Sequence, residues 1–289
     1  MEGRENNWTD GGNCPDFPDW PKFRKFFVFA SGLPDPLRSA FRDAELLLRS
    51  ARPIKVSGST TAGVAAVEGV SYFVKRSNVP TLFDRVRRLG RLSRAQRNFL
   101  ASERLAALGI RVPKVLMALN TARHGLPGPS YLVTEFLEPP MMVHDNFPAM
   151  LERRPLAHWV RKMASLMALM HRDGICHGDL KMVNFLAVAA PEEADGFTLG
   201  VLDFDGTKLT GRPVSRGARR KELARAVSSC LLRLAMPEIG AAPEPEALLR
   251  NWCDAYLEAG GTDLRGDRKL DKLLRAFLDR AGRRGKGLS

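Results

Sequence analysis

An acid, a cation and an amide lie at close spacing in residues 177–186, His-Gly-Asp-Leu-Lys-Met-Val-Asn-Phe-Leu. Phosphoryl transfer needs a carboxylate that orients and deprotonates the attacking hydroxyl, a cation for the migrating charge and an oxygen ligand for Mg²⁺. Asp179, Lys181 and Asn184 match these three requirements. They are therefore predicted to be the catalytic carboxylate, the catalytic cation and a metal ligand, whereas His177 is interpreted as a structural residue that holds the loop.

A second acidic segment follows about 20 residues later, at residues 199–206, Leu-Gly-Val-Leu-Asp-Phe-Asp-Gly. An apolar strand that ends in carboxylates is a typical setting for a Mg²⁺ ligand. Asp203 is predicted to be that ligand because it directly follows the apolar run. Asp205 is interpreted either as a second ligand or as a turn former before Gly206.

Together the two segments resemble the signatures of the protein-kinase-like superfamily, a catalytic loop with Asp, Lys and Asn followed by Asp-Phe-Gly. More narrowly, the His-Gly-Asp-Leu-Lys run, the Leu-Asp-Phe-Asp run and the arginine-rich stretch that follows resemble the bacterial lipopolysaccharide core kinase family, which phosphorylates Kdo or heptose. The likeness covers roughly residues 55–235. It implies ATP and Mg²⁺ as cofactors and an acidic glycolipid, the lipopolysaccharide core, as acceptor.

The resemblance also implies how ATP is held. A lysine on the third strand of the first lobe, here Lys75, would grip the α and β phosphates, with Glu103 on the following helix as its partner. Residues Glu135 to Leu137 would form the hinge that meets adenine. The alternative for Glu103 is a surface pair with the neighbouring arginines.

Three departures from the protein-kinase pattern bear on the acceptor. Residues 58–63, Gly-Ser-Thr-Thr-Ala-Gly, lack G-x-G-x-x-G, although Gly58 and Gly63 bound a loop whose amides could still cover phosphates. Gly178 stands where many protein kinases carry an arginine that reads a phosphorylated loop, and the short stretch from Asp203 to the next helix near Arg219 has no Ala-Pro-Glu. A platform for a peptide is missing, which favours a small molecule or a glycan.

The elements that must position these residues form two groups. Short apolar runs predict an antiparallel sheet, and a capping box at Ser93 and Gln96 predicts one main helix that Gly109 ends. From Pro155 onward the apolar spacing is helical. The expected fold is α+β, a two-lobed protein-kinase-like fold with a small antiparallel-sheet N-lobe and a larger, mainly helical C-lobe. The predicted divisions are a leader and extension (1–50), the N-lobe that grips the nucleotide phosphates (51–138) and the helical C-lobe with the catalytic loop and metal site (139–289).

Composition and charge narrow the functional classes. The 289 residues carry a formal charge of +13, and four distant cysteines form no CxxC pair, so neither a zinc site nor a disulfide framework is expected. No apolar run approaches the roughly 20 residues that cross a bilayer, and residues 1–20 do not resemble a signal peptide. We expect a cytoplasmic protein held peripherally at the inner face of the cytoplasmic membrane.

The positive charge is concentrated in residues 84–97, 208–225 and 265–286. Arginine clusters suit phosphate and carboxylate recognition, so the first two are expected to serve ATP and an acidic acceptor, and basic clusters could also contact an anionic membrane surface. No helix-turn-helix, aromatic stacking motif or zinc pattern supports binding of nucleic acid.

The leading hypothesis is an ATP-dependent kinase of a sugar hydroxyl, heptose or Kdo, in the lipopolysaccharide inner core. One alternative is a kinase of a soluble small molecule or of protein serine and threonine. Another is a pseudokinase that acts only as an interaction module. The loss of Asp179, Asn184 or Asp203 would indicate a pseudokinase, but all three are present.

Overall fold

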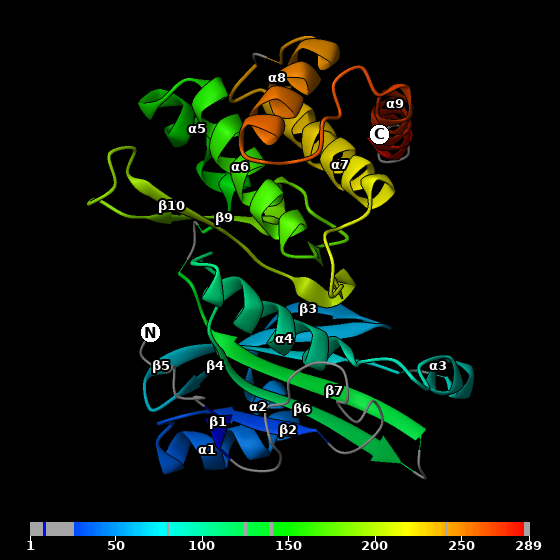
Figure 1. Ribbon diagram of the computed structural model, residues 1–289. Helices are drawn as coiled ribbons and strands as arrows, with labels where there is room; N and C mark the ends of the chain where they lie inside the picture. Colours follow the sequence, from blue (N-terminus) through cyan, green and yellow to red (C-terminus); the bar gives the residue numbers. More distant parts are fainter. Residues whose placement is uncertain are drawn as a thin grey trace, which may run out of the picture. The chain divides into compact units, whose positions relative to one another are not determined.

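The computed structural model (Figure 1) describes residues 8–9, 26–79, 81–123, 126–138, 141–240 and 242–285. It divides into two compact units. One comprises Met1–Glu103 and Pro113–Leu137, and we call it the sheet unit. The other comprises Arg104–Val112 and Glu138–Ser289, and we call it the helical unit. The leader at 1–20 lies outside the described residues apart from 8–9, as does the connector Pro139–Pro140.

The sheet unit is built on one seven-stranded antiparallel sheet. Its strands, in spatial order, are β1 (Trp8–Thr9), β2 (Phe27–Ala30), β6 (Val115–Arg123), β7 (Leu126–Glu135), β5 (Val70–Ser77), β4 (Thr60–Val67) and β3 (Arg52–Ser57). The predicted antiparallel sheet is confirmed: β3, β4 and β5 form a meander, and β6 pairs with β7. Glu68 and Gly69, both with positive φ, form the tight turn between β4 and β5.

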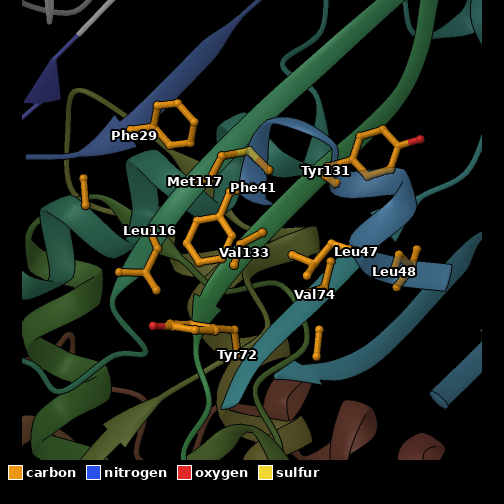
Figure 2. Close-up of a cluster of buried hydrophobic side chains, with 13 residues drawn as sticks. Phe29, Phe41, Leu47, Leu48, Tyr72, Val74, Leu116, Met117, Tyr131 and Val133 are labelled. Atoms are coloured by element: carbon orange, nitrogen blue, oxygen red, sulfur yellow. The ribbon is translucent and has the colours of Figure 1, made fainter. Parts of the chain in front are cut away.

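Residues 26–50, grouped with the leader in the sequence analysis, are part of this unit. The apolar run Phe27–Ala30 pairs with β6, and helices α1 (Asp35–Arg42) and α2 (Ala44–Ser50) pack on the sheet. Figure 2 shows Phe41 from α1 among Leu116, Met117 and Val133 of the sheet. The sequence pattern did not separate this segment from the leader because its helices are short.

A half-buried hydrogen-bond network also fastens α2 to the sheet. Both carboxylate oxygens of Glu45 accept from Arg76 of β5 at 2.8 Å, and the Tyr131 hydroxyl of β7 donates to Glu45 at 2.8 Å. Burial, together with the Glu45 carboxylate, raises the pKa of Tyr131 to about 12. Strand β5, which carries Lys75, is thus held both by its strand neighbours and by α2.

The main helix of the sheet unit begins as predicted. In α4 (Arg94–Ala107) the backbone N–H of Gln96 donates to the Ser93 hydroxyl at 3.0 Å. The side-chain oxygen of Gln96 accepts from the backbone N–H of Ser93 at 2.9 Å. This is the reciprocal capping box. Gly109 follows the helix with φ +75°, a backbone conformation that favours glycine at a helix end. A short helix, α3 (Leu82–Arg87), precedes α4.

The helical unit contains five helices among its described residues: α5 (Val143–Arg153), α6 (Leu156–Arg172), α7 (Arg216–Leu234), α8 (Pro245–Glu258) and α9 (Arg268–Gly285). The predicted apolar face of α6 is confirmed as core, because Trp159, Met163, Met167 and Met170 are fully buried. None of the described helices is long and apolar enough to cross a membrane.

Two small sheets of the helical unit position the two segments that contain the predicted site residues, 177–186 and 199–206. Strand β8 (Ile175–Cys176) pairs with β11 (Lys208–Leu209), and β9 (Phe185–Ala189) pairs with β10 (Phe197–Val201). The first segment therefore runs from β8 into β9 through a short 3₁₀ turn at Met182–Asn184, and the second follows β10. The pairing of β9 with β10 brings the ends of the two segments together.

We expect Asp195, buried beside β10, to stabilise this unit in a pH-dependent way. Its Oδ2 accepts from Lys162 at 2.7 Å and from His158 at 2.8 Å. Burial raises its pKa, but these hydrogen bonds outweigh burial and lower the pKa to about 2. Because the pKa of Asp195 is lower in the folded chain, its stabilisation is present above about pH 4 and is lost as the pH falls through about 2. This stabilisation contributes about 2 kcal/mol to the free energy of unfolding. Unfolding free energies of wild type and Asp195→Asn should converge on acidification. Curves that stay parallel would contradict this account.

Candidate active site

The predicted catalytic carboxylate lies on the loop that follows β8. The Asp179 side chain is 46% exposed, so it can meet a ligand from solvent. Its Oδ1 accepts from the Arg225 guanidinium of α7 at 2.6 Å, and its Oδ2 lies 3.3 Å from the Lys181 ammonium. Arg225 also donates to the Gly178 carbonyl at 2.7 Å. The carboxylate is thus oriented by two cations, one of which the sequence analysis placed in the site.

The structure brings Asn184 against the same loop. Its side-chain amide donates to the Asp179 carbonyl at 2.8 Å, which leaves the side-chain oxygen as an acceptor. Its backbone carbonyl accepts from Leu202 N–H at 3.0 Å, so Asp203 directly follows the residue bonded to Asn184. The two predicted metal ligands therefore lie on hydrogen-bonded neighbouring segments.

Asp203 adopts an unusual backbone conformation, with φ 65° and ψ 70°. Positive φ is uncommon outside glycine and is enriched at functional sites. Asp203 lies between β10 and the 3₁₀ turn Phe204–Gly206, which contains Asp205. One amide and one or two carboxylate oxygens fit Mg²⁺, which usually takes few protein ligands and completes its octahedron with water and phosphate oxygens. The described residues hold no cluster of three or more His, Cys, Asp and Glu.

Gly178 is required by local geometry. Its φ is +85°, and a Cβ there would lie 2.5 Å from the Gly206 carbonyl oxygen. The loop and the Asp203–Gly206 segment therefore approach each other at a point where only glycine fits. The absence of an arginine at this position has a steric reason besides the regulatory one that the sequence suggested.

His177 has the structural role that was predicted. Its Nε2 donates to the Leu202 carbonyl at 2.9 Å, and its own carbonyl accepts from Thr207. The ring is fully buried and packs edge-on against Phe204. His177 therefore links the loop that carries Asp179 to the segment that carries Asp203, and it is not placed to act on a substrate.

Glu222 of α7, like Arg225, is a residue of the site that the sequence analysis missed. It is 3% exposed and accepts from His177 N–H at 3.2 Å, from Gly178 N–H and from the His171 ring at 2.7 Å. Burial raises its pKa, but the hydrogen bond and charge of His171 lower the pKa overall. The sequence did hold a signal, since Glu222 and Arg225 are an acid and a cation three residues apart on one predicted helix and therefore share a face.

The second arginine cluster is engaged within the fold more than was expected. Arg219 is 7% exposed and donates to the Val214 carbonyl and the Tyr256 hydroxyl, while Arg216 and Arg220 pair with Asp267. The expectation that this whole cluster binds anions is wrong for Arg219, because its guanidinium is buried in a structural network. Arg225 is the member of the cluster that contacts the Asp179 carboxylate.

The predicted phosphate-binding loop is shorter than expected. Residues Thr60–Gly63 lie in β4, where β-branched Thr60 and Thr61 pair with β5, so only Gly58 and Ser59 connect the strands. A Cβ at Gly63 would lie 2.7 Å from the Arg52 carbonyl oxygen, so this glycine serves close strand approach beside a register shift. Arg94 holds the two-residue turn by donating to the Ser59 carbonyl at 3.1 Å. A Cβ at Gly58 would meet no atom within 4 Å, which leaves the turn open to a ligand.

The other predicted nucleotide-binding residues lie in the sheet unit. Lys75 is half-buried on β5 opposite Leu132 of β7, and Glu103 is exposed on α4. Arg104, a neighbour of Glu103, is paired with Asp173 at 2.5 Å. Glu135 ends β7 and accepts from Lys114 N–H at 2.9 Å, and Leu137 follows it in extended chain. The roles of these four residues stay predictions.

The three cysteines among the described residues are structural. Cys176 is partly buried, Cys230 and Cys253 are buried, and none forms a disulfide. Burial raises the pKa of each thiol to about 12. They are therefore protonated and unreactive at neutral pH.

Comparison with known proteins identifies the class of this site. Residues 47–250 match the model of the lipopolysaccharide kinase (Kdo/WaaP) family. A structure of WaaP in complex with acyl carrier protein is similar at a TM-score of 0.60 and 21% identity, covering 89% of this chain and 98% of that one. A Rio2 kinase structure from Chaetomium thermophilum matches at a TM-score of 0.43 and 16% identity, over 84% of this chain and 76% of that one. None of the curated protein sequences gives a significant match. The predicted kinase-like α+β fold is confirmed.

Proposed function

Because the chain belongs to the lipopolysaccharide kinase (Kdo/WaaP) family, it is a phosphotransferase of a lipopolysaccharide core sugar, and we propose that Asp179 is its catalytic carboxylate. The observation that carries this proposal is the exposed Asp179 carboxylate, held by Arg225 at 2.6 Å and Lys181 at 3.3 Å on a loop tied to Asn184. The family match favours the sugar kinase over a protein kinase or a pseudokinase.

ATP is the proposed phosphoryl donor, and Asn184 and Asp203 are the proposed Mg²⁺ ligands. When bound, Mg²⁺ supplies positive charge to the donor phosphates. Lys75, supported by Glu103, would bind the α and β phosphates, while Glu135 and Leu137 would offer backbone groups to adenine. Gly58 fits the phosphate-covering turn, whereas the position of Gly63 within β4 leaves it without a direct role there. Asp205 stays a candidate second ligand.

The chain's own residues divide the chemistry between orientation and charge. Asp179 would accept a hydrogen bond from the sugar hydroxyl and take up its proton as the phosphoryl group is transferred. Lys181, already beside that carboxylate, would neutralise charge that develops on the phosphoryl group. Arg225 restricts the carboxylate to one orientation, and Phe277 of α9 packs on its guanidinium with 5.2 Å between Cζ and the ring centroid. The C-terminal helix would thereby support catalysis.

The acceptor is proposed to be a heptose or Kdo hydroxyl of an acidic glycolipid, met at the inner face of the cytoplasmic membrane. Exposed arginines of the chain supply charge that complements such an acceptor. The decisive experiment incubates the purified protein with Mg²⁺-ATP and lipopolysaccharide core acceptors that carry heptose or Kdo. Mass spectrometry should detect one added phosphate, which free sugars and a generic protein should not acquire. Equal labelling of all acceptors would reject the proposal.

We expect Arg225→Ala to lower kcat about 10–100-fold with little change in the KM for ATP, since a hydrogen bond between charged groups is worth about 1.5–3 kcal/mol. Arg225→Lys should recover part of the loss by restoring the charge. Lys221→Ala removes an exposed cation from the same helix and serves as the matched control. Steady-state phosphate transfer measures these effects, and equal losses for Arg225→Ala and Lys221→Ala would contradict the positioning role.

A further inference from the structure

Helix α3 and the turns after it expose an unusual amount of apolar surface. Leu82 is 67% exposed, Phe83 74%, Val86 51% and Leu89 42%. These are four of the ten large hydrophobic side chains that are exposed among the described residues, and they fall within eight consecutive positions. None of the six residues of α3, all of which are described, is buried. Packing against the part of the chain that the structure describes therefore does not explain why the segment is apolar.

These side chains form one stripe. At about 100° per residue, Leu82, Phe83 and Val86 fall within an arc of roughly 100° on the helix. The turn hydrogen bond from Leu89 N–H to the Val86 carbonyl, at 3.0 Å, continues the helical course to Leu89. By the same spacing, Arg85 and Arg87 lie on either side of the stripe. Figure 1 shows α3 at one end of the sheet unit, beyond the start of α4.

The charge around the stripe is mainly positive. Arg85, Arg87, Arg88 and Arg91 accompany it, and Asp84 is the single acid of residues 81–91. Asp84 is engaged in the helix cap, since its N–H donates to the Thr81 hydroxyl at 3.1 Å and its carboxylate accepts from that hydroxyl at 2.7 Å. An apolar stripe flanked by arginines is the arrangement of helices that lie in a membrane interface, with apolar side chains among the acyl chains and cations at the headgroups.

We propose that residues 82–91 are a docking surface for an anionic lipid membrane, with Phe83 and its apolar neighbours inserted and the arginines at the lipid phosphates. The proposal deepens the proposed function and rests on it in one respect: the acceptor is a glycolipid and must be met at a membrane. A short interfacial segment of this size gives reversible attachment, which suits an enzyme that must leave after transfer.

The test measures binding of the full-length protein, without ATP, to vesicles of phosphatidylglycerol and phosphatidylethanolamine by co-flotation. We expect Phe83→Ser combined with Val86→Ser to weaken binding at least about tenfold, because two large apolar side chains are lost from the interface. The matched control is Leu46→Ser with Val70→Ser, which removes two comparably exposed apolar side chains of the sheet unit, 63% and 53% exposed. It should bind like wild type.

A second pair of variants tests the charges. Arg85→Gln with Arg87→Gln should weaken binding about tenfold at low salt and abolish the preference over phosphatidylcholine vesicles. Arg52→Gln with Lys55→Gln removes two exposed cations of β3 and should change binding less than about twofold. Equal losses for both pairs would mean that net charge, rather than this surface, binds lipid, and would overturn the proposal.

Two further outcomes would also overturn the membrane-docking proposal. The first is that wild type does not bind vesicles. The second is that the α3 variants keep vesicle binding but lose binding to an acyl carrier protein, which would make the stripe a protein-docking surface. A soluble, delipidated core oligosaccharide separates this proposal from the proposed function. The Phe83→Ser with Val86→Ser variant should phosphorylate it at the wild-type rate. If wild type fails to phosphorylate any core acceptor, the kinase proposal fails while the vesicle result still decides the docking surface.

Discussion

Replacing Asp179 by Asn should reduce phosphate transfer to a core acceptor by a factor of about 10²–10⁴, the usual contribution of a positioned acid–base group. Asparagine keeps the shape of the side chain and can still accept from Arg225, but it cannot take up the proton of the hydroxyl. The side chain is 46% exposed, so the substitution should leave the unfolding temperature within a few degrees of wild type. The measurement is kcat together with the KM for ATP, and we expect the loss in kcat alone.

The control for this experiment is Asp145→Asn, which removes an exposed carboxylate of the same unit whose side chain is 38% exposed. It should keep full activity. Binding of ATP to both variants, measured by calorimetry, separates a chemical defect from a binding defect. Turnover by Asp179→Asn within about twofold of wild type would show that another group takes the proton and would reject the role given to Asp179.

The parts of the fold with strong local signals could be predicted from the sequence. The capping box at Ser93 and Gln96, the apolar face of α6 and the short apolar runs of β4 and β5 each depend on neighbours in the chain. The segments with Asp179, Asn184 and Asp203 were likewise found because the functional groups are close in sequence. The pairing of β9 with β10 then brings the two segments together, as their shared chemistry requires.

Features that depend on distant residues were missed. Residues 58–63 look like a glycine-bounded loop. The hydrogen-bonded ladder with β5, however, extends strand β4 through residues 60–63. Residues 26–50 look like an extension of the leader, but pairing of Phe27–Ala30 with β6 joins them to the sheet. Glu222 looks like one acid in a basic run, and its role appears only when α7 packs against the catalytic loop, 45 residues away in sequence from His177.

The largest loss of stability is expected at Glu222. Removal of one partner from a buried, charged hydrogen-bond network costs about 3–5 kcal/mol, because the remaining donors lose their acceptor without gaining water. Glu222→Ala leaves the N–H groups of His177 and Gly178 and the His171 ring without this carboxylate. The free energy of unfolding, measured in urea, should fall by that amount. Activity of the folded fraction should fall as well, because these two amides directly precede Asp179 in the loop.

Glu222→Gln is the sharper test, because it keeps the shape and removes only the charge and one acceptor. Oε2 of Glu222 accepts from His171 and His177, and Oε1 accepts from Gly178, so an amide NH₂ at either position would face a donor. We therefore expect Gln to destabilise the fold nearly as much as Ala. The matched control is Glu238→Gln, at a carboxylate that is 51% exposed and paired with Arg233, and it should change the free energy of unfolding little. If the Glu222→Gln variant were as stable as wild type, the carboxylate would be replaceable by any polar group of its shape.

The same network sets a direction for the pH dependence. The pKa of Glu222 is lower in the folded chain than in the unfolded chain, so its contribution is present above the unfolded pKa, near 4.5, and is lost as the pH falls through the lower folded value. Wild type should therefore lose stability on acidification more steeply than Glu222→Gln. The loop that carries Asp179 is then expected to open first, because protonation of the Glu222 carboxylate releases the amides of this loop. On acidification, the protection of the His177 and Gly178 amides against hydrogen exchange should fall before the protection of amides in the core of α6 does. A simultaneous loss of protection would show that the network and the core unfold as one unit.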